Sequence, residues 1–325
     1  MKLLEFKKVI RECEYSNTYK MAWAKAIIEL SNKYFDNVNE YSELSLFDIA
    51  LKMFKYYWDQ TIFFNLFQSA PNQPPVILSE VKRIITIYKD NVDEFKPIVF
   101  ERVISSFDEK LNKELTKSIR RSVSNIKEYV MIRFLNLNSI KYDFYKIDNK
   151  NNKIIIKTSF LKELYNNQED LFDLINYRWS MMLENYNSCP RIAKKVRIMD
   201  EQVIDRKSLK IFDKFLDLEN KNHICFICGK EINEHELSRD HVIPWSYMYS
   251  DDLWNIVYVH KGCNSSKSNI TPSQEVINNL KERNNKLKEL LHIKYGDRNL
   301  KLLQEFDYAI ENDFVDKFYL GCKGC

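Results

Sequence analysis

The sequence predicts a mainly α-helical protein in which a large helical N-terminal domain is followed by a small module of different composition and then by C-terminal helices. Three observations carry this prediction. All five glycines lie at or after Gly229, and residues 98–189 contain no proline, so most of the chain lacks the residues that break helices. Apolar residues recur every three or four positions, as they do on one face of a helix. Four of the five histidines and three of the seven cysteines fall between residues 221 and 263.

Length and composition limit the class of protein. The 325 residues allow about two domains, and a content of 45% hydrophobic residues is enough for a large core, which excludes an intrinsically disordered chain. No apolar run approaches the ~20 residues of a membrane helix, and the charged N-terminal segment is unlike a signal peptide, so we expect a cytoplasmic protein. Seven cysteines are too few for a disulfide scaffold. The net charge of +4 suits an anionic partner without identifying one.

The helices of the N-terminal part are predicted from periodicity and from capping residues. An apolar face that includes Trp23 indicates a helix over 19–34. Ser45 followed by Asp48 is typical of a capped helix start, and clustered prolines make 70–75 a loop. The tryptophans of this part are expected in the core: Trp23, Trp58 and Trp179. Further helices are expected over 76–90, 93–112 and 116–137, then two more to about 187, and one over 208–220.

One segment departs from the helical pattern. In residues 142–158, YDFYKI and KIIIKT flank a polar turn and predict a β-hairpin. Thr271 and Pro272 mark a helix start, and helices are expected over 273–294 and about 297–317. We therefore expect three parts: a helical domain over 1–215, the distinct module over 216–271, and C-terminal helices over 272–325 that pack on the module.

Two pairs of potential metal ligands enclose the module. Cys225-x-x-Cys228 is followed by a glycine, so both thiolates can chelate one ion from a tight turn. His260-x-x-Cys263 supplies a second pair with the same spacing. Such pairs in a cytosolic chain favour a metal over disulfides. We expect a closed, tetrahedral structural zinc site formed by Cys225, Cys228, His260 and Cys263. His223 is an alternative to His260.

Between the two pairs, short blocks of residues resemble the HNH endonuclease motif. In order along the chain, the blocks are Asp240-His241-Val242-Ile243-Pro244, then Asn255, then Cys263-Asn264-Ser265-Ser266-Lys267. The segment over about 221–270 resembles the HNH subfamily in which CxxC pairs bracket a ββα-metal fold. The resemblance implies hydrolysis of phosphodiester bonds. By motif position it implies that Asp240 and Asn264 bind a metal, that His241 is the general base, that Asn255 holds the His241 imidazole or its loop, and that Lys267 meets a phosphate.

The chemistry of these side chains agrees independently with such an activity. Phosphodiester hydrolysis needs an activated water and a cation facing the developing negative charge. A carboxylate and an amide oxygen suit Mg²⁺, with Mn²⁺ as a substitute, whereas a histidine in place of Asn264 would suit softer metals. An imidazole can accept a proton near neutral pH. Adjacent strand residues face opposite sides, so Asp240 and His241 reach one site only if the strand ends or bends there; otherwise Asp240 is not a ligand.

The module itself is a poor binding surface for phosphates, since residues 221–270 contain five basic and six acidic residues. Three other segments are rich in lysine and arginine: 113–133, 141–158 and 191–207. For any one of them a solvated charged surface is the simpler explanation. The run 191–197 is the preferred candidate because it precedes the module. The residues expected to contact nucleic acid are Arg191, Lys194, Lys195 and Arg197, together with Lys117, Arg120 and Arg121.

The sequence therefore predicts a metal-dependent HNH endonuclease that acts on nucleic acid, most simply double-stranded DNA, with zinc as structural and Mg²⁺ as catalytic ion. A restriction or phage-defence role fits an added helical domain by analogy only. Cutting both strands would need two active sites, which suggests a homodimer. Two alternatives stay open. One is a zinc module that binds nucleic acid or protein without cleaving it; the other is an RNA-cleaving nuclease, because a water nucleophile does not need the ribose hydroxyl.

Overall fold

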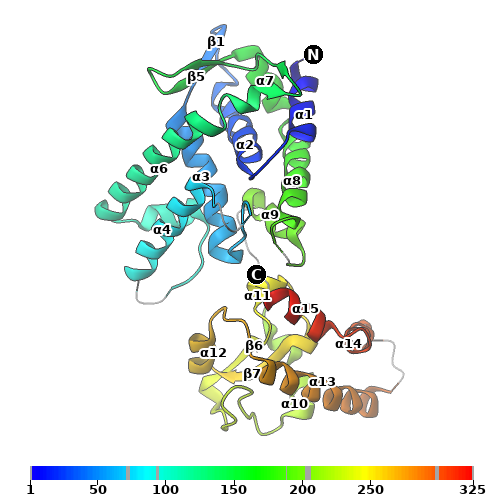
Figure 1. Cartoon of the computed structure of the whole chain (residues 1–325). Coiled ribbons are helices and arrows are strands. Elements are labelled where there is room, and N and C mark those ends of the chain that lie inside the picture. Colours follow the sequence, from blue (N-terminus) through cyan, green and yellow to red (C-terminus); the bar gives the residue numbers. More distant parts are fainter. Residues whose placement is uncertain are drawn as a thin grey trace. The chain divides into compact units, whose positions relative to one another are not determined.

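The structure is a computed structural model that describes residues 2–70, 74–92, 95–187, 189–201, 206–296 and 300–323. The chain forms two compact units (Figure 1). The first unit comprises Met1–Asn187 and Ile192–Ile204, and the second comprises Ser188–Arg191 and Asp205–Cys325. Helices dominate both units, so the predicted mainly α class is confirmed.

The first unit consists mostly of helices. Its α-helices are α1 Lys2–Glu12, α2 Tyr19–Ser31, α3 Leu46–Phe64, α4 Val76–Asp90, α5 Phe100–Val103, α6 Glu109–Tyr129, α7 Thr158–Asn166, α8 Gln168–Glu184 and α9 Ile192–Glu201. Its 3₁₀ helices are η1 Asn32–Tyr34, η2 Ile104–Ser106 and η3 Arg133–Leu135. Helix α3 packs against α2, α4, α6 and α9, and α2 also packs against α8 (Figure 1).

The three tryptophans of this unit lie in its core, as predicted. Each is buried, and each indole N–H has an acceptor: Trp23 donates to the Tyr145 hydroxyl at 3.1 Å, Trp58 to the Ile98 carbonyl at 3.0 Å, and Trp179 to the Gln68 side-chain oxygen at 3.0 Å. Because the polar end of each ring is satisfied, the large apolar area is buried without an unpaired donor.

Strands of the first unit form two small antiparallel sheets. The predicted hairpin over 142–158 is confirmed as β4 Lys146–Asp148 and β5 Lys153–Lys157. A third strand, β1 Tyr41–Ser45, pairs with β5 and was not predicted. The second sheet consists of β2 Asn136–Leu137 and β3 Ile140–Lys141.

Two predicted helix boundaries in this unit are wrong. Instead of helices over 93–112 and 116–137, the chain forms the short α5 and η2 and then the long α6. The Asp108 carboxylate accepts a hydrogen bond from the Leu111 backbone N–H at 2.7 Å, so Asp108 caps α6 and starts a new helix there. Pro97 disfavours a helical conformation in the residue before it, which accounts for the late start of α5. Residues 93 and 94 lie outside the described residues.

The second unit combines one small sheet with several helices. Its helices are η4 Leu209–Phe212, α10 Asp213–Glu219, η5 Glu234–Glu236, α11 Trp245–Met248, η6 Leu253–Asn255, α12 Lys261–Lys267, α13 Gln274–Tyr295, α14 Lys301–Glu311 and α15 Phe314–Lys323. Its strands are β6 Leu237–His241 and β7 Ile256–His260. Residues 206–215, expected with the N-terminal domain, lie in this unit, because Phe212 and Phe215 belong to its core.

The C-terminal helices and the sheet share this core. The buried Arg283 of α13 donates to the backbone carbonyls of Leu253 and Ile256, next to β7. The Trp254 ring stacks on Phe318 of α15 at 5.8 Å between centroids. A single helix over 297–317 was predicted, but Asp313 adopts a positive φ of 52° and separates α14 from α15. Residues 297–299 lie outside the described residues.

Among the described helices, none combines the length and the apolar character that a membrane crossing needs.

Candidate functional site

A β-hairpin followed by a helix forms the framework of the site. Strands β6 and β7 are antiparallel, with Leu237 opposite His260 and His241 opposite Ile256. Helix α12 begins directly after β7, at Lys261, and packs on both strands. The connection 242–255 runs from the end of β6 to the start of β7 and contains α11 and η6. Residues from β6, the connection and α12 are thereby brought to one end of the sheet.

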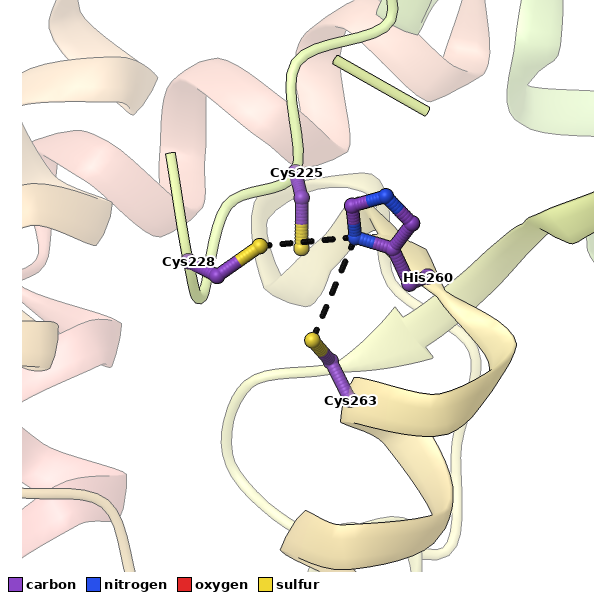
Figure 2. A group of neighbouring side chains, drawn as sticks. All are labelled: Cys225, Cys228, His260 and Cys263. Carbon is purple, nitrogen blue, oxygen red and sulfur yellow. Dashed lines mark hydrogen bonds between the residues drawn. The ribbon is translucent and has the colours of Figure 1, made fainter. Parts of the chain in front are cut away.

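The two predicted ligand pairs form one cluster. The sulfur atoms of Cys225, Cys228 and Cys263 and a ring nitrogen of His260 lie within 4.8 Å of one another (Figure 2). His260 Nδ1 is 3.4 Å from Cys228 Sγ and 3.9 Å from Cys263 Sγ. The other ring nitrogen, Nε2, is 3.1 Å from the Glu231 carbonyl oxygen. Nδ1 therefore points into the cluster while Nε2–H can donate outward, as in histidines that ligate metals.

The turn between Cys225 and Cys228 requires the glycine that follows. Gly229 has a φ of +70°, which side chains with a Cβ rarely adopt. Its N–H donates to the Cys225 carbonyl at 2.9 Å, and the Cys225 N–H donates to the Lys230 carbonyl at 2.8 Å. The chain thus folds back on itself and presents both thiols on one side (Figure 2).

The electrostatics of the cluster favour ligation. Burial acts to raise the pKa of the Cys225 thiol, but hydrogen bonds from backbone amides, that of Cys228 first, lower it to about 6. Burial and the neighbouring sulfurs raise the pKa of Cys263 to about 11. The lowered pKa favours the thiolate form of Cys225, and a bound cation would favour deprotonation of Cys263 as well. Three sulfurs and one imidazole nitrogen are compatible with a closed structural zinc site.

His223, the alternative fourth ligand, is not in the cluster. Its Nε2 is 3.2 Å from Asp217 Oδ1, and its ring packs edge-on against Tyr258. The positive φ of His223, 48°, belongs to the turn that leads into the cysteine pair. His260 is therefore the imidazole that joins the three cysteines in the cluster.

Two contacts join α12 to one face of β6. Asn264 Nδ2 donates to Ser238 Oγ at 3.3 Å, and Lys267 Nζ donates to Asp240 Oδ2 at 2.6 Å. Ser238 and Asp240 are two positions apart on the strand and so share a face. Asn264 and Lys267 are three positions apart on α12 and so are neighbours as well. The Asp240 carboxylate and the Asn264 amide therefore lie on the face of β6 that α12 contacts, and carboxylate and amide oxygens are ligands that suit Mg²⁺.

His241 is the last residue of β6, and its side chain has a different partner from that of Asp240. Its Nε2 is 2.9 Å from Asp251 Oδ1, and 8% of the residue is exposed. The backbone oxygen of His241 accepts a hydrogen bond from the Lys267 ammonium, which also holds Asp240. The strand β6 ends at His241, the position where an end or bend is needed if Asp240 is to be a metal ligand, and Lys267 contacts both neighbouring residues.

The Asn255 side chain forms hydrogen bonds with the loop that follows His241 and not with the His241 imidazole. Its Nδ2 donates to the Ile243 carbonyl at 2.9 Å, and its Oδ1 accepts from the Ile243 N–H at 2.8 Å. The Asn255 backbone carbonyl also accepts from the Val242 N–H at 2.9 Å. Because Asn255 is fully buried, these bonds fix the path of the chain immediately after His241. Of the two roles predicted for Asn255, only the loop contact is present.

An arginine not predicted as a site residue lies nearby. The Arg206 guanidinium lies over the Trp245 ring, 4.1 Å from its centroid, and is within electrostatic range of the Asp251 and Asp240 carboxylates. The sequence offered only weak signals for Arg206 and Asp251. Arg206 is one of many charges in 191–207, and Asp251 lies ten residues after His241, a separation to which no periodicity assigns a contact.

The residues predicted to contact phosphates are distributed over both units. The run 191–197 is divided, because Arg191 belongs to the second unit and the residues that follow belong to the first. Arg191 donates to the Met248 carbonyl at 2.9 Å. Lys195 is fully buried, with its ammonium over the Phe64 ring, so its predicted phosphate contact is wrong. Lys194 and Arg197 are exposed on α9.

The basic residues of α6 are largely paired with acids. Lys117 is 2.7 Å from Glu114, and Arg121 is 3.3 Å from Glu80. Arg120 is exposed. Surface pairs of this kind open readily, so they reduce the positive charge that α6 offers to a phosphate without blocking it.

Comparison with known proteins agrees with this geometry. Residues 225–273 match the family model described as HNH endonuclease. No curated protein and no solved structure shows significant similarity to the chain. The matched segment begins at the first cysteine of the cluster and includes β6, β7 and α12. The second unit of this chain therefore contains an HNH endonuclease domain, bracketed by a Cys₃His cluster that fits the ligand pattern of the family.

Proposed function

We propose that the second unit hydrolyses phosphodiester bonds in DNA, with His241 as the general base and with Mg²⁺ held by Asp240 and Asn264. One observation carries the proposal. In a domain that matches the HNH family, Lys267 of α12 contacts both the Asp240 carboxylate and the His241 backbone, and Asn264 lies on the same face of that helix. The Asp240 carboxylate and the Asn264 amide thus lie beside one short helix, which also holds the His241 backbone, while the His241 imidazole contacts Asp251 in the connection.

In this proposal His241, Asn255 and Lys267 each have a separate role in the reaction. His241 accepts a proton from water, and the resulting hydroxide attacks the phosphorus while the bond to the leaving oxygen breaks. Asn255 holds the backbone that follows His241, so the imidazole keeps its direction. Lys267 stabilises negative charge on the phosphate once Asp240 is occupied by a cation rather than by the ammonium.

The residues around the proposed metal position have the right chemistry for a hard divalent cation. In the structure the Lys267 ammonium is paired with the half-buried Asp240 carboxylate, and this pairing supports the proposal that a cation can bind there. When bound, Mg²⁺ would supply Lewis-acid stabilisation of the charge that develops on the phosphate oxygens. The Cys₃His cluster serves a different purpose in this proposal, because zinc there would fix Cys263 and hence the adjacent Asn264.

The proposed substrate is duplex DNA. The helical first unit is proposed to recognise the target or to regulate cleavage. The proposed biological role is restriction or phage defence. Positive charge close to the site supports a nucleic-acid partner. Arg206, Lys267 and Arg191 all lie in the second unit, within or beside the connection and α12. Such contacts predict that binding weakens steeply as salt concentration rises.

A matched pair of variants tests the proposal. His241→Ala removes the proposed base, whereas His235→Ala removes an exposed imidazole from the same domain. Each protein is checked for zinc content and helix content and is then assayed for nicking of supercoiled plasmid with Mg²⁺, Mn²⁺ or EDTA. We expect H241A to lose roughly 10²–10⁴-fold in rate, as for removal of a general base, and H235A to cleave normally.

Equal cleavage by H241A and the unmodified protein would reject the mechanism. Matched single-stranded, duplex and RNA substrates separate a DNA nuclease from an RNA nuclease. Binding of DNA without cleavage, by all variants and with every metal, would favour a zinc module that only binds its partner.

A further inference from the structure

We propose that Asp251 is a positioning residue for His241: its carboxylate holds the imidazole as the Nε2–H tautomer, so that Nδ1 is the atom that takes the proton from water. This inference rests on the proposed nuclease function and names a further residue of the same site. Asp251 lies in the connection between α11 and η6, ten residues after His241, and is not part of the motif that the sequence resembles.

The hydrogen bond between the two side chains defines the tautomer. Asp251 Oδ1 is 2.9 Å from His241 Nε2. An ionised carboxylate can only accept hydrogen bonds, so the imidazole must donate, and the proton must reside on Nε2. The other nitrogen, Nδ1, then carries the lone pair. Within the part of the chain that the structure describes, Nδ1 has no protein hydrogen-bond partner.

The surroundings of the pair make the carboxylate effective. His241 is almost buried, so the charge of Asp251 is poorly screened by water at that point. When Nδ1 takes a proton, the imidazolium that forms is stabilised by the adjacent negative charge. The positive charge of Arg206 lies within electrostatic range of the Asp251 carboxylate. Lys267 holds the backbone oxygen of His241, so ring and backbone are fixed from two directions.

The proton and electron balance of the step is simple. A water O–H bond breaks as the oxygen forms a bond to phosphorus, and the P–O bond to the leaving oxygen breaks with its electron pair. The water proton goes to His241 Nδ1, while the proton on Nε2 stays there, hydrogen-bonded to Asp251. Asp251 does not change its own protonation state.

The neighbouring carboxylate provides a matched control. Asp252 has similar exposure but contacts Ser250 Oγ at 2.5 Å and lies 4.0 Å from Arg191, away from the imidazole. Asp251→Ala and Asp252→Ala remove the same charge from the same loop. A general effect of loop charge on DNA binding would appear in both variants, whereas a positioning effect would appear only in D251A.

The first measurement is kinetic, on the full-length protein with duplex DNA and Mg²⁺. We expect D251A and D251N to lower kcat by about 10- to 100-fold with little change in KM, a smaller loss than that for removal of the base itself. D252A should stay within about twofold of the unmodified protein. Normal zinc content and thermal unfolding of D251N show that a lower rate is not a folding defect. A D251A variant that retains kcat, or a D252A variant that loses as much, would overturn the inference.

The second measurement does not depend on activity. In protein labelled with ¹⁵N-histidine, the His241 signal is assigned by its loss in H241A, and its two nitrogen shifts report the tautomer of the neutral ring. We expect the Nε2–H form in the unmodified protein and in D252A, and a shift toward a mixture in D251A. A dominant Nδ1–H form in the unmodified protein would refute the inference even if the protein cleaves DNA. If the unmodified protein cleaves no substrate, the nuclease proposal fails. The tautomer measurement still shows separately whether Asp251 positions the His241 ring.

Discussion

In the first unit, the lysine Lys25 lies inside the helical core and its partners join helices to one another, whereas in the second unit charged side chains meet at the end of a two-stranded sheet. Lys25 of α2 is 1% exposed and contacts Asp200 of α9 at 2.5 Å and Asn176 of α8 at 2.9 Å. In the second unit, Asp240, Lys267 and the His241–Asp251 pair keep part of their side-chain surface accessible.

This difference in exposure indicates a structural role for the buried charge of the first unit and a ligand-binding role for the accessible charges of the second. A charge that is fully enclosed and fully paired can order helices but cannot meet a ligand. A charge at a sheet end, held by one partner from a short helix or loop, can exchange that partner for a cation or a phosphate. Buried ion pairs contribute little net stability, since desolvation offsets their attraction, but breaking one is costly. The two units should therefore respond in different ways to loss of a single charged group.

The largest effect is expected from loss of the cysteine cluster. Cys225→Ser should abolish zinc binding and disorder the β6–β7 hairpin and α12, because structural zinc contributes about 10 kcal/mol or more of folding free energy in small metal-bound folds. The first unit should stay folded, because it has a separate core. Metal analysis and hydrogen exchange of both units measure this. Cys189→Ser, outside the cluster, should retain zinc. Unchanged protection of the hairpin in zinc-free C225S would contradict the prediction.

The next effect is expected in the first unit. Lys25→Met leaves Asp200 without its cation and should lower the free energy of unfolding by about 3 kcal/mol, at the lower end of the range for broken buried pairs, because Asp200 is partly exposed. Urea unfolding followed by signals from the first unit gives the value. Nuclease activity of the second unit in K25M should scale only with the folded fraction. A change below 1 kcal/mol would show that the pair does not stabilise the helical core.

A pH-dependent effect is expected at Asp59 of α3. Its Oδ1 accepts from the Phe100 N–H at 2.7 Å, its buried Oδ2 has no hydrogen-bond partner among the residues that the structure describes, and burial raises the pKa to about 7. Because the folded state holds the proton more tightly than the unfolded state, the stability contribution of Asp59 is present below pH ~4 and is lost as the pH rises to about 7, by up to about 1.4 kcal/mol per unit.

Asp59→Asn cannot titrate and should avoid this loss. The difference in melting temperature, D59N minus the unmodified protein, should therefore increase from pH 5 to pH 8. Thermal unfolding of both proteins across that interval measures the difference. A constant difference would mean that Asp59 does not titrate in this range.

The smallest effect is expected at an exposed pair of the same charge types. Lys113 and Glu109 of α6 are 2.7 Å apart, but both side chains are mostly exposed. Lys113→Met should change the free energy of unfolding by about 0.5 kcal/mol or less, because solvent screens the attraction. Parallel urea titrations of K113M and K25M compare loss of a lysine outside and inside the core. Similar losses in the two variants would contradict the contrast drawn between them.

Short-range features of the fold were predictable because their causes are local. The Ser45 cap of α3 accepts from the Phe47 N–H at 3.1 Å, and the polar turn of the β4–β5 hairpin lies where the sequence placed it. The strand β1 was missed because its pairing with β5 joins residues more than a hundred positions apart. The burial of Lys195 was missed for a related reason: local charge density does not show which side of α9 faces the core.

The sequence by itself determined the Cys₃His cluster and the HNH match of the second unit, because ligand spacing, a left-handed glycine and the order of the motif blocks are properties of neighbouring residues. Only the tertiary structure decided that Asn255 holds the loop and not the imidazole, that Asp251 contacts His241, and that Arg206 lies beside them. These contacts depend on how a connection of more than ten residues folds over the sheet end, and that path is set by the packing of the whole unit rather than by the spacing of its residues.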